Sequence, residues 1–174
     1  MTFNEIVEII KNECDESIID QTAQEDGLMP FAIVSKDNLL KLGQFLYENP
    51  KCYFDYLACV TGMDNGPGKD DGEGEKGTME IIYNLYSIPF DSKFCFKVIL
   101  HRNHVKQPMP EIESVSHIWR TANWHEREIF DLYGIHFANH PDLRRILLPA
   151  DWEGFPLRKD YKLQEYYHEI KVEY

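Results

Sequence analysis

Seven histidines and thirty acidic residues give this 174-residue sequence many groups that could bind a metal or move a proton. His125 and Glu126 begin an H-E pair, but the second histidine of the zinc-protease pattern H-E-x-x-H is missing. His136 and His140 are four residues apart, yet a glycine and a proline flank them, which disfavours one helix carrying both. A free-standing metal-dependent enzyme using His125, His136 or His140 stays one alternative.

Thiol and carboxylate chemistry finds little support in the spacing of the residues. The four cysteines, Cys14, Cys52, Cys59 and Cys95, form no C-x-x-C pair, although iron–sulfur clusters and structural zinc usually use closely spaced cysteines. The case for acid–base catalysis by Glu126 and Glu128 is weak, because side chains two positions apart on a helix point in different directions. No G-x-S-x-G or dinucleotide fingerprint occurs. The sequence therefore predicts no catalytic residue, cofactor-binding residue or metal ligand in this chain.

Charge and hydropathy exclude further classes. The net charge of −12 speaks against nucleic-acid binding and against direct binding to an anionic membrane. No apolar run is long enough to span a bilayer, and the start resembles neither a secretory signal nor a transit peptide. Residues 62–77 hold six of the ten glycines among acidic residues, which predicts a solvated hairpin loop rather than a phosphate loop or an EF-hand. We expect a soluble intracellular protein that partners can hold at a membrane.

The apolar spacing indicates the elements that position these groups. It predicts helices over 2–12, 38–48 and 113–133, and strands over 17–21, 31–34, 53–61, 78–87 and 93–101. Ser35 or Asp37 is expected to cap the second helix. The fold class is α+β: a mainly antiparallel sheet with helices on one face, followed by a long helix and an extended irregular C-terminal arm. The expected units are 1–110, 111–137 and 138–174.

The long helix carries carboxylates that need partners. Glu126 falls in its apolar stripe, where a charge requires a counter-ion. Glu128 and Asp131 lie on another face. The segment 140–161 supplies guanidinium groups that pair well with carboxylates. Those side chains are Arg144, Arg145 and Arg158.

The segment 140–161 has the composition of a binding arm. It is rich in aromatic, leucine and arginine residues within an irregular, proline-containing backbone, a mixture found at interface hot spots. A disordered tail would lack such residues. Composition alone leaves open whether this arm binds a partner or wraps its own domain.

One stretch of the sequence resembles a known family. Residues Ala122–Tyr161 read ANWHEREIFDLYGIHFANHPDLRRILLPADWEGFPLRKDY, and this is similar to the signature of the 30 kDa subunit of respiratory complex I, which in bacteria is the C subunit of NADH–quinone oxidoreductase. The likeness includes E-R-E at 126–128, the His-Pro pair at 140–141 and the segment 156–161. It extends more weakly upstream, to about residue 30.

The resemblance implies a role inside a larger complex. In this family the 30 kDa protein holds no flavin, iron–sulfur cluster or quinone ligand; FMN and the Fe–S clusters belong to partner subunits. Its C-terminal arm lies against the 49 kDa subunit, in the peripheral arm on the cytoplasmic side of the bacterial inner membrane. Membrane association then arises only through the complex.

The resulting hypothesis is a non-catalytic structural and assembly subunit of a proton-translocating NADH–quinone oxidoreductase. An equivalent scaffold subunit of a membrane-bound energy-converting hydrogenase, or of a related oxidoreductase that does not use NADH, is the alternative. A chain ending before His140 is expected to leave a folded domain. The predicted partner interface comprises Glu126, Glu128, Asp131, Arg144, Arg145, Trp152, Phe155, Arg158 and Tyr161.

Overall fold

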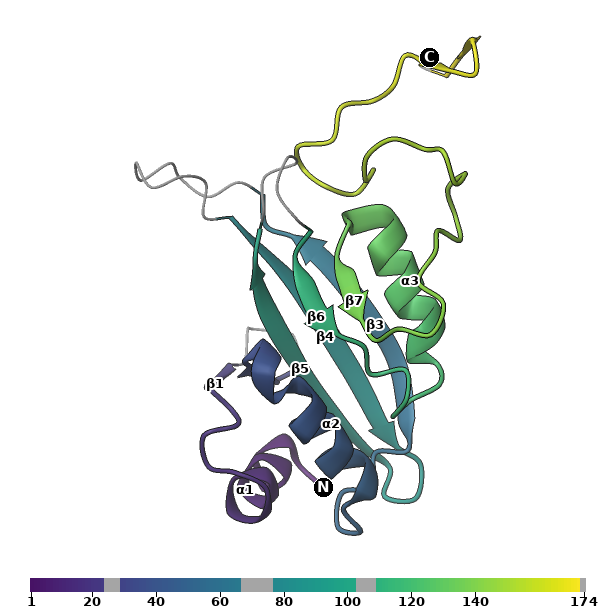
Figure 1. Cartoon of the computed structure of the whole chain (residues 1–174). Coiled ribbons are helices and arrows are strands. Elements are labelled where there is room, and N and C mark those ends of the chain that lie inside the picture. The colour runs from purple at the N-terminus through teal and green to yellow at the C-terminus, as the bar shows by residue number, and fades with distance from the viewer. Residues whose placement is uncertain (24–28, 67–76, 103–108, 173–174) are drawn as a thin grey trace.

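The centre of the molecule is a five-stranded sheet (Figure 1). The computed structural model describes residues 1–23, 29–66, 77–102 and 109–172. The strand order is β1-β2-β5-β4-β3, and every neighbouring pair is antiparallel except β2 with β5. This confirms the predicted α+β class with a mainly antiparallel sheet. The strands are β1 Gln21–Ala23, β2 Phe31–Val34, β3 Tyr56–Asp64, β4 Thr78–Ser87 and β5 Ser92–His101.

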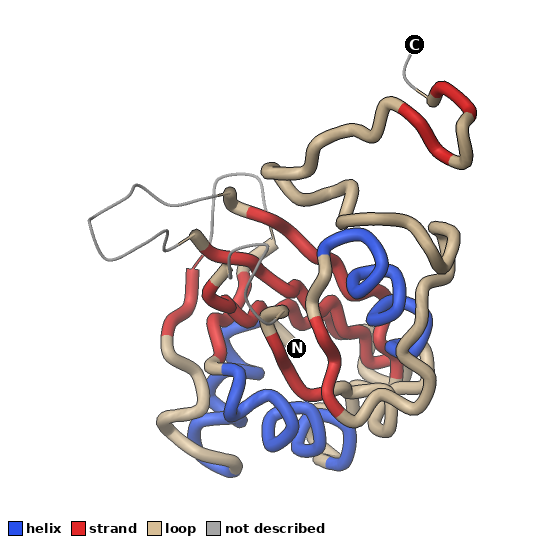
Figure 2. The backbone as a smooth tube through the Cα atoms, turned by 45° about the horizontal axis from the view of Figure 1, so that its top comes forward, coloured by secondary structure: helices blue, strands red, loops and turns tan. Residues whose placement is uncertain are grey.

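Three α-helices pack on one face of this sheet (Figure 2). They are α1 Phe3–Glu13, α2 Leu39–Glu48, which follows the 3-10 turn η1 Lys36–Asn38, and α3 Ala122–Tyr133. Thr2 and Glu5 form a reciprocal capping box that starts α1. Gly134 ends α3 with φ of 70°, a left-handed conformation that glycine adopts without steric cost.

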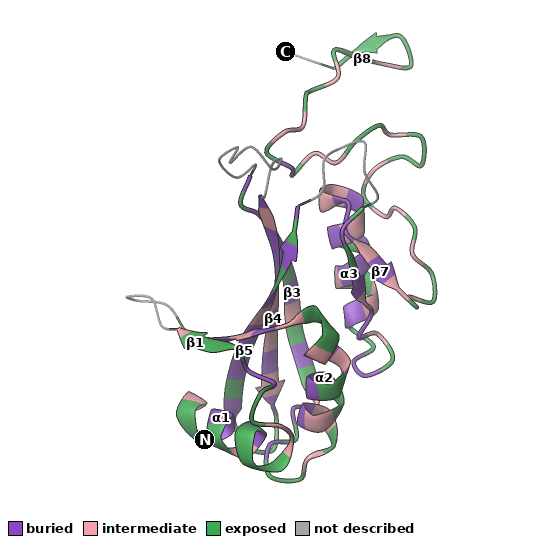
Figure 3. Ribbon diagram, turned by 60° about the vertical axis from the view of Figure 1, so that its left-hand side comes forward, coloured by how far each residue is buried: buried purple, intermediate pink, exposed green. Residues whose placement is uncertain are grey.

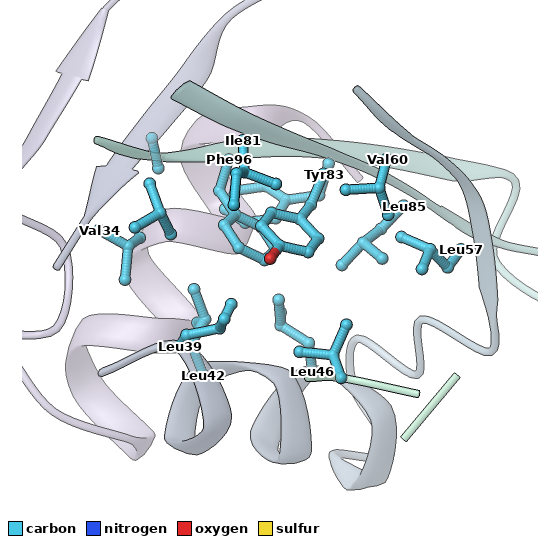
Figure 4. Close-up of a cluster of buried hydrophobic side chains, with 14 of the residues drawn as sticks. Val34, Leu39, Leu42, Leu46, Leu57, Val60, Ile81, Tyr83, Leu85 and Phe96 are labelled. Atoms are coloured by element: carbon cyan, nitrogen blue, oxygen red, sulfur yellow. The ribbon is translucent and has the colours of Figure 1, made fainter. Parts of the chain in front are cut away.

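Strict alternation along the central strands creates the core. On β4, Met79, Ile81, Tyr83 and Leu85 point toward the helices and are buried, because successive side chains of a strand face opposite sides. Figure 4 shows the buried side chains of this strand meeting the leucines of α2. The opposite face of the sheet carries no helix among the described residues, and its side chains range from buried Glu80 and Cys95 to exposed Ile99.

Two small sheets complete the described structure. β6 Glu111–Glu113 pairs in parallel with β7 His136–Ala138, and β8 Tyr166–Tyr167 forms a short hairpin with β9 Ile170–Lys171. No sequence pattern predicted these strands, since two or three residues carry too little periodicity. The longest described α-helix has 12 residues, and none has the length and hydropathy that a membrane crossing requires.

The predicted helix over 113–133 is wrong in its first half. The helix begins only at Ala122, and residues 114–121 form turns in which the amides of Ile118 and Trp119 both donate to the carbonyl of Val115. The Trp119 indole donates to the carbonyl of Phe54 at 2.8 Å, which fixes the turn against the sheet. The apolar residues of this turn are spaced as they would be in a helix, so the periodicity of the sequence could not distinguish the turn from a helix.

Other boundaries also shift. Residues 17–21 are not a strand except at Gln21, where β1 begins, and β3 begins at Tyr56 instead of 53 because Tyr53 has a positive φ of 37°. β3 continues through Gly62 to Asp64. Ser35 makes no side-chain capping bond, and α2 starts after Asn38. Of the predicted loop over 62–77, residues 67–76 lie outside the described part.

Gly62 marks the close approach of α3 to β3. A Cβ atom there would lie 2.9 Å from the Tyr133 ring and 3.2 Å from the Ile129 side chain. We expect Gly62→Val to lower the free energy of unfolding by about 1–3 kcal/mol through overpacking, measured by urea denaturation. The matched control is Thr61→Val on the exposed side of the same strand, expected to stay within about 0.5 kcal/mol. Equal losses in both variants would contradict this packing argument.

Candidate functional site

The arm, defined here as residues 140–161, packs along α3 and reaches one end of the sheet (Figures 2 and 3). Leu143 contacts the hydrophobic core, the Leu157 amide donates to the carbonyl of Leu132, and the Lys159 amide donates to Asp64. The arm therefore lies on its own chain, whatever else it binds. This weakens the ground for expecting a folded domain from a chain that ends before His140, although that expectation stays untested.

Asp131 is the first anchor of the arm. Its carboxylate is fully buried, and Oδ2 accepts the consecutive backbone amides of Ile146, Leu147 and Leu148 at 3.0, 2.7 and 3.0 Å. Oδ1 accepts Arg145 Nη1 at 2.7 Å. Burial alone would raise the pKa of Asp131, but these amides and the guanidinium outweigh it and hold the pKa below its usual range.

Arg145 extends this anchor to the following turn. Its Nη1 also donates to the Asp131 carbonyl, and its Nη2 donates to the carbonyls of Trp152 and Gly154 at 3.1 and 3.0 Å. The guanidinium lies over the Phe155 ring, 5.2 Å from its centroid. Phe155 in turn covers Gly134, where a Cβ atom would come within 2.5 Å of the ring. The end of α3 and the arm therefore fit only with glycine at 134.

A second anchor lies at the end of the sheet where β3 and β5 stop. Asp64 Oδ1 accepts Arg102 Nε at 2.8 Å, and Oδ2 accepts the Lys159 amide at 2.8 Å. Arg102 Nη2 lies 2.6 Å from Asp160 Oδ1, an ion pair whose hydrogen-bond alignment is poor. Burial opposes ionisation of Asp64, yet the amides of Lys159 and Gly66 and the guanidinium hold its pKa below the ordinary value.

Glu126 occupies the third buried site. It is fully buried on α3, accepts the Ser114 hydroxyl at 2.6 Å and the Val115 amide at 2.8 Å, and has no guanidinium partner among the ion pairs of the described residues. Burial raises the pKa of Glu126 to about 7, although the two hydrogen bonds act against this. Glu126 thus locks the loop before α3 to the helix and can hold a proton near neutral pH.

His140 opens the arm beside this carboxyl group. Its Nδ1 accepts the Asp142 amide at 3.0 Å, so Nε2 carries the proton of the neutral ring and donates to the Asn123 carbonyl at 3.1 Å. Nε2 lies 3.8 Å from Glu126 Oε2. Burial lowers the pKa of His140, which keeps the ring neutral. Both ring nitrogens are engaged by the fold.

The remaining predicted site residues differ in their exposure. Glu128 and Arg144 face solvent, and Arg144 pairs with Asp142 at 3.0 Å. Trp152 and Tyr161 are half-buried and share a hydrogen bond of 3.1 Å from the indole to the hydroxyl. Arg158 is buried and lies 3.2 Å from Asp160.

The predicted interface set therefore divides in two. Seven of the nine residues are buried or half-buried and have contacts within the chain, whereas Glu128 and Arg144 are exposed, with Arg144 paired to the exposed Asp142. Whether any of these residues touches a partner stays a prediction.

Sequence reasoning missed Arg102, Asp64 and Ser114 as members of the site. Arg102 and Asp64 are 38 residues apart, and no local pattern marks them as a pair. Ser114 lay inside the wrongly extended helix, which hid its role as a partner of Glu126. The one usable signal was Glu126 itself, a carboxylate in an apolar stripe.

The described residues bring together no group of three or more side chains suited to a metal ion. His136 Nδ1 lies 2.9 Å from Glu111, and His140 is bonded as described above. The three buried acids are held by hydrogen bonds from within the chain, and ion pairs join two of them to Arg145 and Arg102. What this arrangement does is fix a surface, with the arm as its outer layer.

Comparisons with known proteins agree with the resemblance. The family model for the respiratory-chain NADH dehydrogenase 30 kDa subunit matches residues 32–167. The NADH-quinone oxidoreductase C subunit of Chloroherpeton thalassium is 41% identical over 95% of this chain, which spans 63% of that relative's length. The C subunit of Chlorobium phaeobacteroides is 43% identical, with 84% of this chain and 81% of the relative covered. That of Trichlorobacter lovleyi is 37% identical over 92% and 90%.

Asp131→Asn tests the first anchor. The amide nitrogen would face donors and the charge would be lost, so we expect hydrogen exchange at the amides of Ile146, Leu147 and Leu148 to accelerate at least about tenfold, since bonds to charged groups contribute about 1.5–3 kcal/mol. Asp142→Asn is the matched control on an exposed carboxylate, with no such acceleration expected. Unchanged exchange at the three amides in Asp131→Asn would refute the anchor.

Glu126→Gln tests the buried carboxyl through pH. The folded pKa of about 7 lies above the value of 4.5 for the free side chain, so the folded state binds more protons between these values. Wild-type stability from this group is complete below about pH 4.5 and is lost as pH rises through about 7. We expect the unfolding free energy of wild type to fall relative to Glu126→Gln by about 3 kcal/mol from pH 4.5 to 8. A constant difference across that range would show that Glu126 ionises normally.

Proposed function

The chain belongs to the family of the respiratory-chain NADH dehydrogenase 30 kDa subunit, and on that premise we propose that it is a structural and assembly subunit of an NADH–quinone oxidoreductase. In this role it performs no chemical step itself. Electron transfer from NADH through FMN and Fe–S clusters to quinone takes place in partner subunits. The chain contributes a rigid surface that holds neighbours in place.

The observation that carries this proposal is which segments expose their large apolar side chains. The most exposed large hydrophobic side chains lie on α3, on the arm and just beyond it, at 49% to 76% exposure. Ile88, at 63%, is the exception. Apolar side chains that are exposed mainly on one helix and on the irregular segment after it favour an interaction role for these segments. These residues are Trp124, Leu147, Leu157, Leu163, Tyr166 and Ile170.

The arrangement of Trp124 supports a protein partner. Its ring is 65% exposed, and the Arg127 guanidinium lies 5.2 Å from the ring centroid, held there by a bond from Nε to the Arg144 carbonyl. Tryptophan beside arginine is the composition of interface hot spots. We propose the 49 kDa-like subunit as the partner of this surface, in line with the family's arrangement.

The thiols fit a chain without clusters of its own. Among the described residues the four thiols join no group of three or more potential metal ligands, whereas iron–sulfur clusters usually take closely spaced cysteines. We propose that FMN and Fe–S clusters reside in partner subunits, and that the chain reaches the cytoplasmic side of the inner membrane only as a peripheral part of the complex.

A second candidate function is the same structural role in a different enzyme complex. An energy-converting hydrogenase or a related oxidoreductase that does not use NADH could carry the same type of scaffold. Purification of the parent complex separates the two, since NADH–quinone activity supports the first and nickel without NADH activity supports the second.

Leu147→Ala tests the docking role. The side chain is 61% exposed, so its removal should leave the unfolding free energy within about 0.5 kcal/mol of wild type. We expect the share of the chain that co-migrates with NADH–quinone oxidoreductase activity on native gels of gently solubilised membranes to fall several-fold. Ile99→Ala, on the uncovered sheet face, is the control and should assemble normally. Normal assembly of Leu147→Ala combined with Trp124→Ala would refute docking through this surface.

A further inference from the structure

A groove borders the outer edge of the small β6–β7 sheet. One wall of the groove comes from η1 and the start of α2, with Lys36, Asp37 and Leu40, and the other wall is β6 itself, together with Ala138. Figure 1 shows β7 between β6 and α3, so one edge of β6 is covered by β7. No strand of the described ranges pairs with the other edge of β6.

The backbone groups of Glu111 and Glu113 point to this free edge. The Pro110 carbonyl and the Ser114 amide both bond to β7, at 2.8 and 2.9 Å. The even-numbered residues of β6 and its flanks therefore turn toward β7, because successive residues of a strand direct their backbone groups to opposite sides. The N–H and C=O groups of Glu111 and Glu113 turn the other way, and no hydrogen bond reaches them from any described residue. Two donors and two acceptors thus face the groove at the spacing of a strand.

The side chains of β6 leave this edge open. The Glu111 carboxylate lies 2.9 Å from His136 on β7, and the Glu113 carboxylate accepts the Asn139 amide group at 2.8 Å. Both charged groups are therefore held on the β7 side, and Ile112 is buried in the core. Proteins commonly protect a strand edge with charged side chains or proline, and here the charges are turned away from the edge. The free edge is neither paired nor blocked within the described structure.

Backbone pairing selects an extended chain as the occupant of the groove. A strand brings one N–H and one C=O group for each residue, so a single strand can bond to both Glu111 and Glu113. A helix uses these groups internally and would leave the edge unpaired. The groove therefore has the chemistry of strand addition, in which main-chain bonds supply affinity and alternate side chains supply specificity.

We propose that an extended segment of a neighbouring subunit adds to the free edge of β6 as a third strand of the β6–β7 sheet. Its backbone pairs with the free groups of Glu111 and Glu113, and an apolar side chain of the segment packs against Leu40 and Ile112, which line the groove. The inference rests on the proposed role as an assembly subunit, and it adds a main-chain contact to the docking surface on α3 and the arm.

Amide hydrogen exchange tests the pairing directly. The full chain is compared alone and within the purified complex. We expect exchange at the amides of Glu111 and Glu113 to slow at least about tenfold on assembly, because a buried main-chain hydrogen bond must open before its amide exchanges. The Ser114 amide, which already bonds to β7, is the internal control and should change little. Equal exchange of the first two amides in both states, or protection already present in the chain alone, would overturn strand addition.

Two variants of Glu113 separate the backbone from the side chain. Glu113→Pro and Glu113→Ala both lose the contact with Asn139, but only proline removes the N–H that faces the groove. With benzoylphenylalanine in place of the exposed Asp37, we expect Glu113→Pro to reduce the cross-link to the neighbouring subunit at least about fivefold. Glu113→Ala should keep most of it. Equal cross-linking in the two variants would contradict main-chain pairing. If the thermal midpoint of Glu113→Pro falls below that of Glu113→Ala, the hydrogen exchange of the unmodified chain decides.

A probe at position 147 distinguishes this inference from the proposed docking through the arm. Benzoylphenylalanine in place of Leu147 reports on the arm, and the same residue in place of Lys11 on α1 is the exposed control without a product. A cross-link from 147 with none from 37 overturns strand addition alone. A cross-link from 37 with none from 147 counts against the arm alone. A product from 37 that joins a second copy of this chain also overturns the proposal, because the occupant is a segment of a different subunit.

Discussion

The burial of carboxylates beneath and beside α3 is the constraint on which the outer half of the structure depends. A carboxylate removed from water requires compensating donors, and the chain meets this need in two ways. Asp131 receives three backbone amides and a guanidinium from the arm, so it stays ionised. Glu126 receives one hydroxyl and one amide, which is too little, so burial raises its pKa to about 7. The two buried acids of this helix therefore differ in pKa, with Asp131 below its ordinary value and Glu126 raised to about 7.

The difference in pKa between Asp131 and Glu126 follows from the number of donors that the neighbouring segment offers to each. Asp131 needs donors that arrive from an irregular segment, and only a fixed turn presents three consecutive amides to one oxygen. The arm thus has one conformation over that turn without a helix or a strand. Glu126 meets a shorter loop from Ser114 and Val115, which has fewer groups to offer. The backbone of the arm is therefore held mainly by Asp131 and Asp64, two acids at distant points of the fold.

Much of the fold could be predicted because the long strands are rich in β-branched and aromatic residues. The predicted strand Thr78–Ser87 matches its observed limits, because it is rich in β-branched and aromatic residues and buries every second side chain from Met79 to Ser87. Glu126 stood out as a charge in an apolar stripe, and the expectation that the tail arginines meet acids of α3 holds for Arg145 with Asp131. The turns at 114–121 could not be told from a helix, because Trp119 bonds to Phe54, 65 residues away. Arg102 and Asp64 likewise meet only through the sheet.

A fixed arm changes the energetics of assembly. Segments that fold on binding lose conformational entropy at that moment, and this loss reduces the affinity gained per unit of buried surface. Here Leu147 and Leu157 are already held by backbone bonds to Asp131 and Leu132, so a partner meets side chains in place. Beyond the arm, the two-residue strands β8 and β9 form a hairpin too small to be stable alone, supported by contacts of Tyr167 with Trp152 and Asp151. Under the proposed docking role, the arm up to Tyr161 presents a fixed surface that sets the orientation of a neighbour, while the β8–β9 hairpin beyond it depends on the contacts of Tyr167 and His168 with the arm.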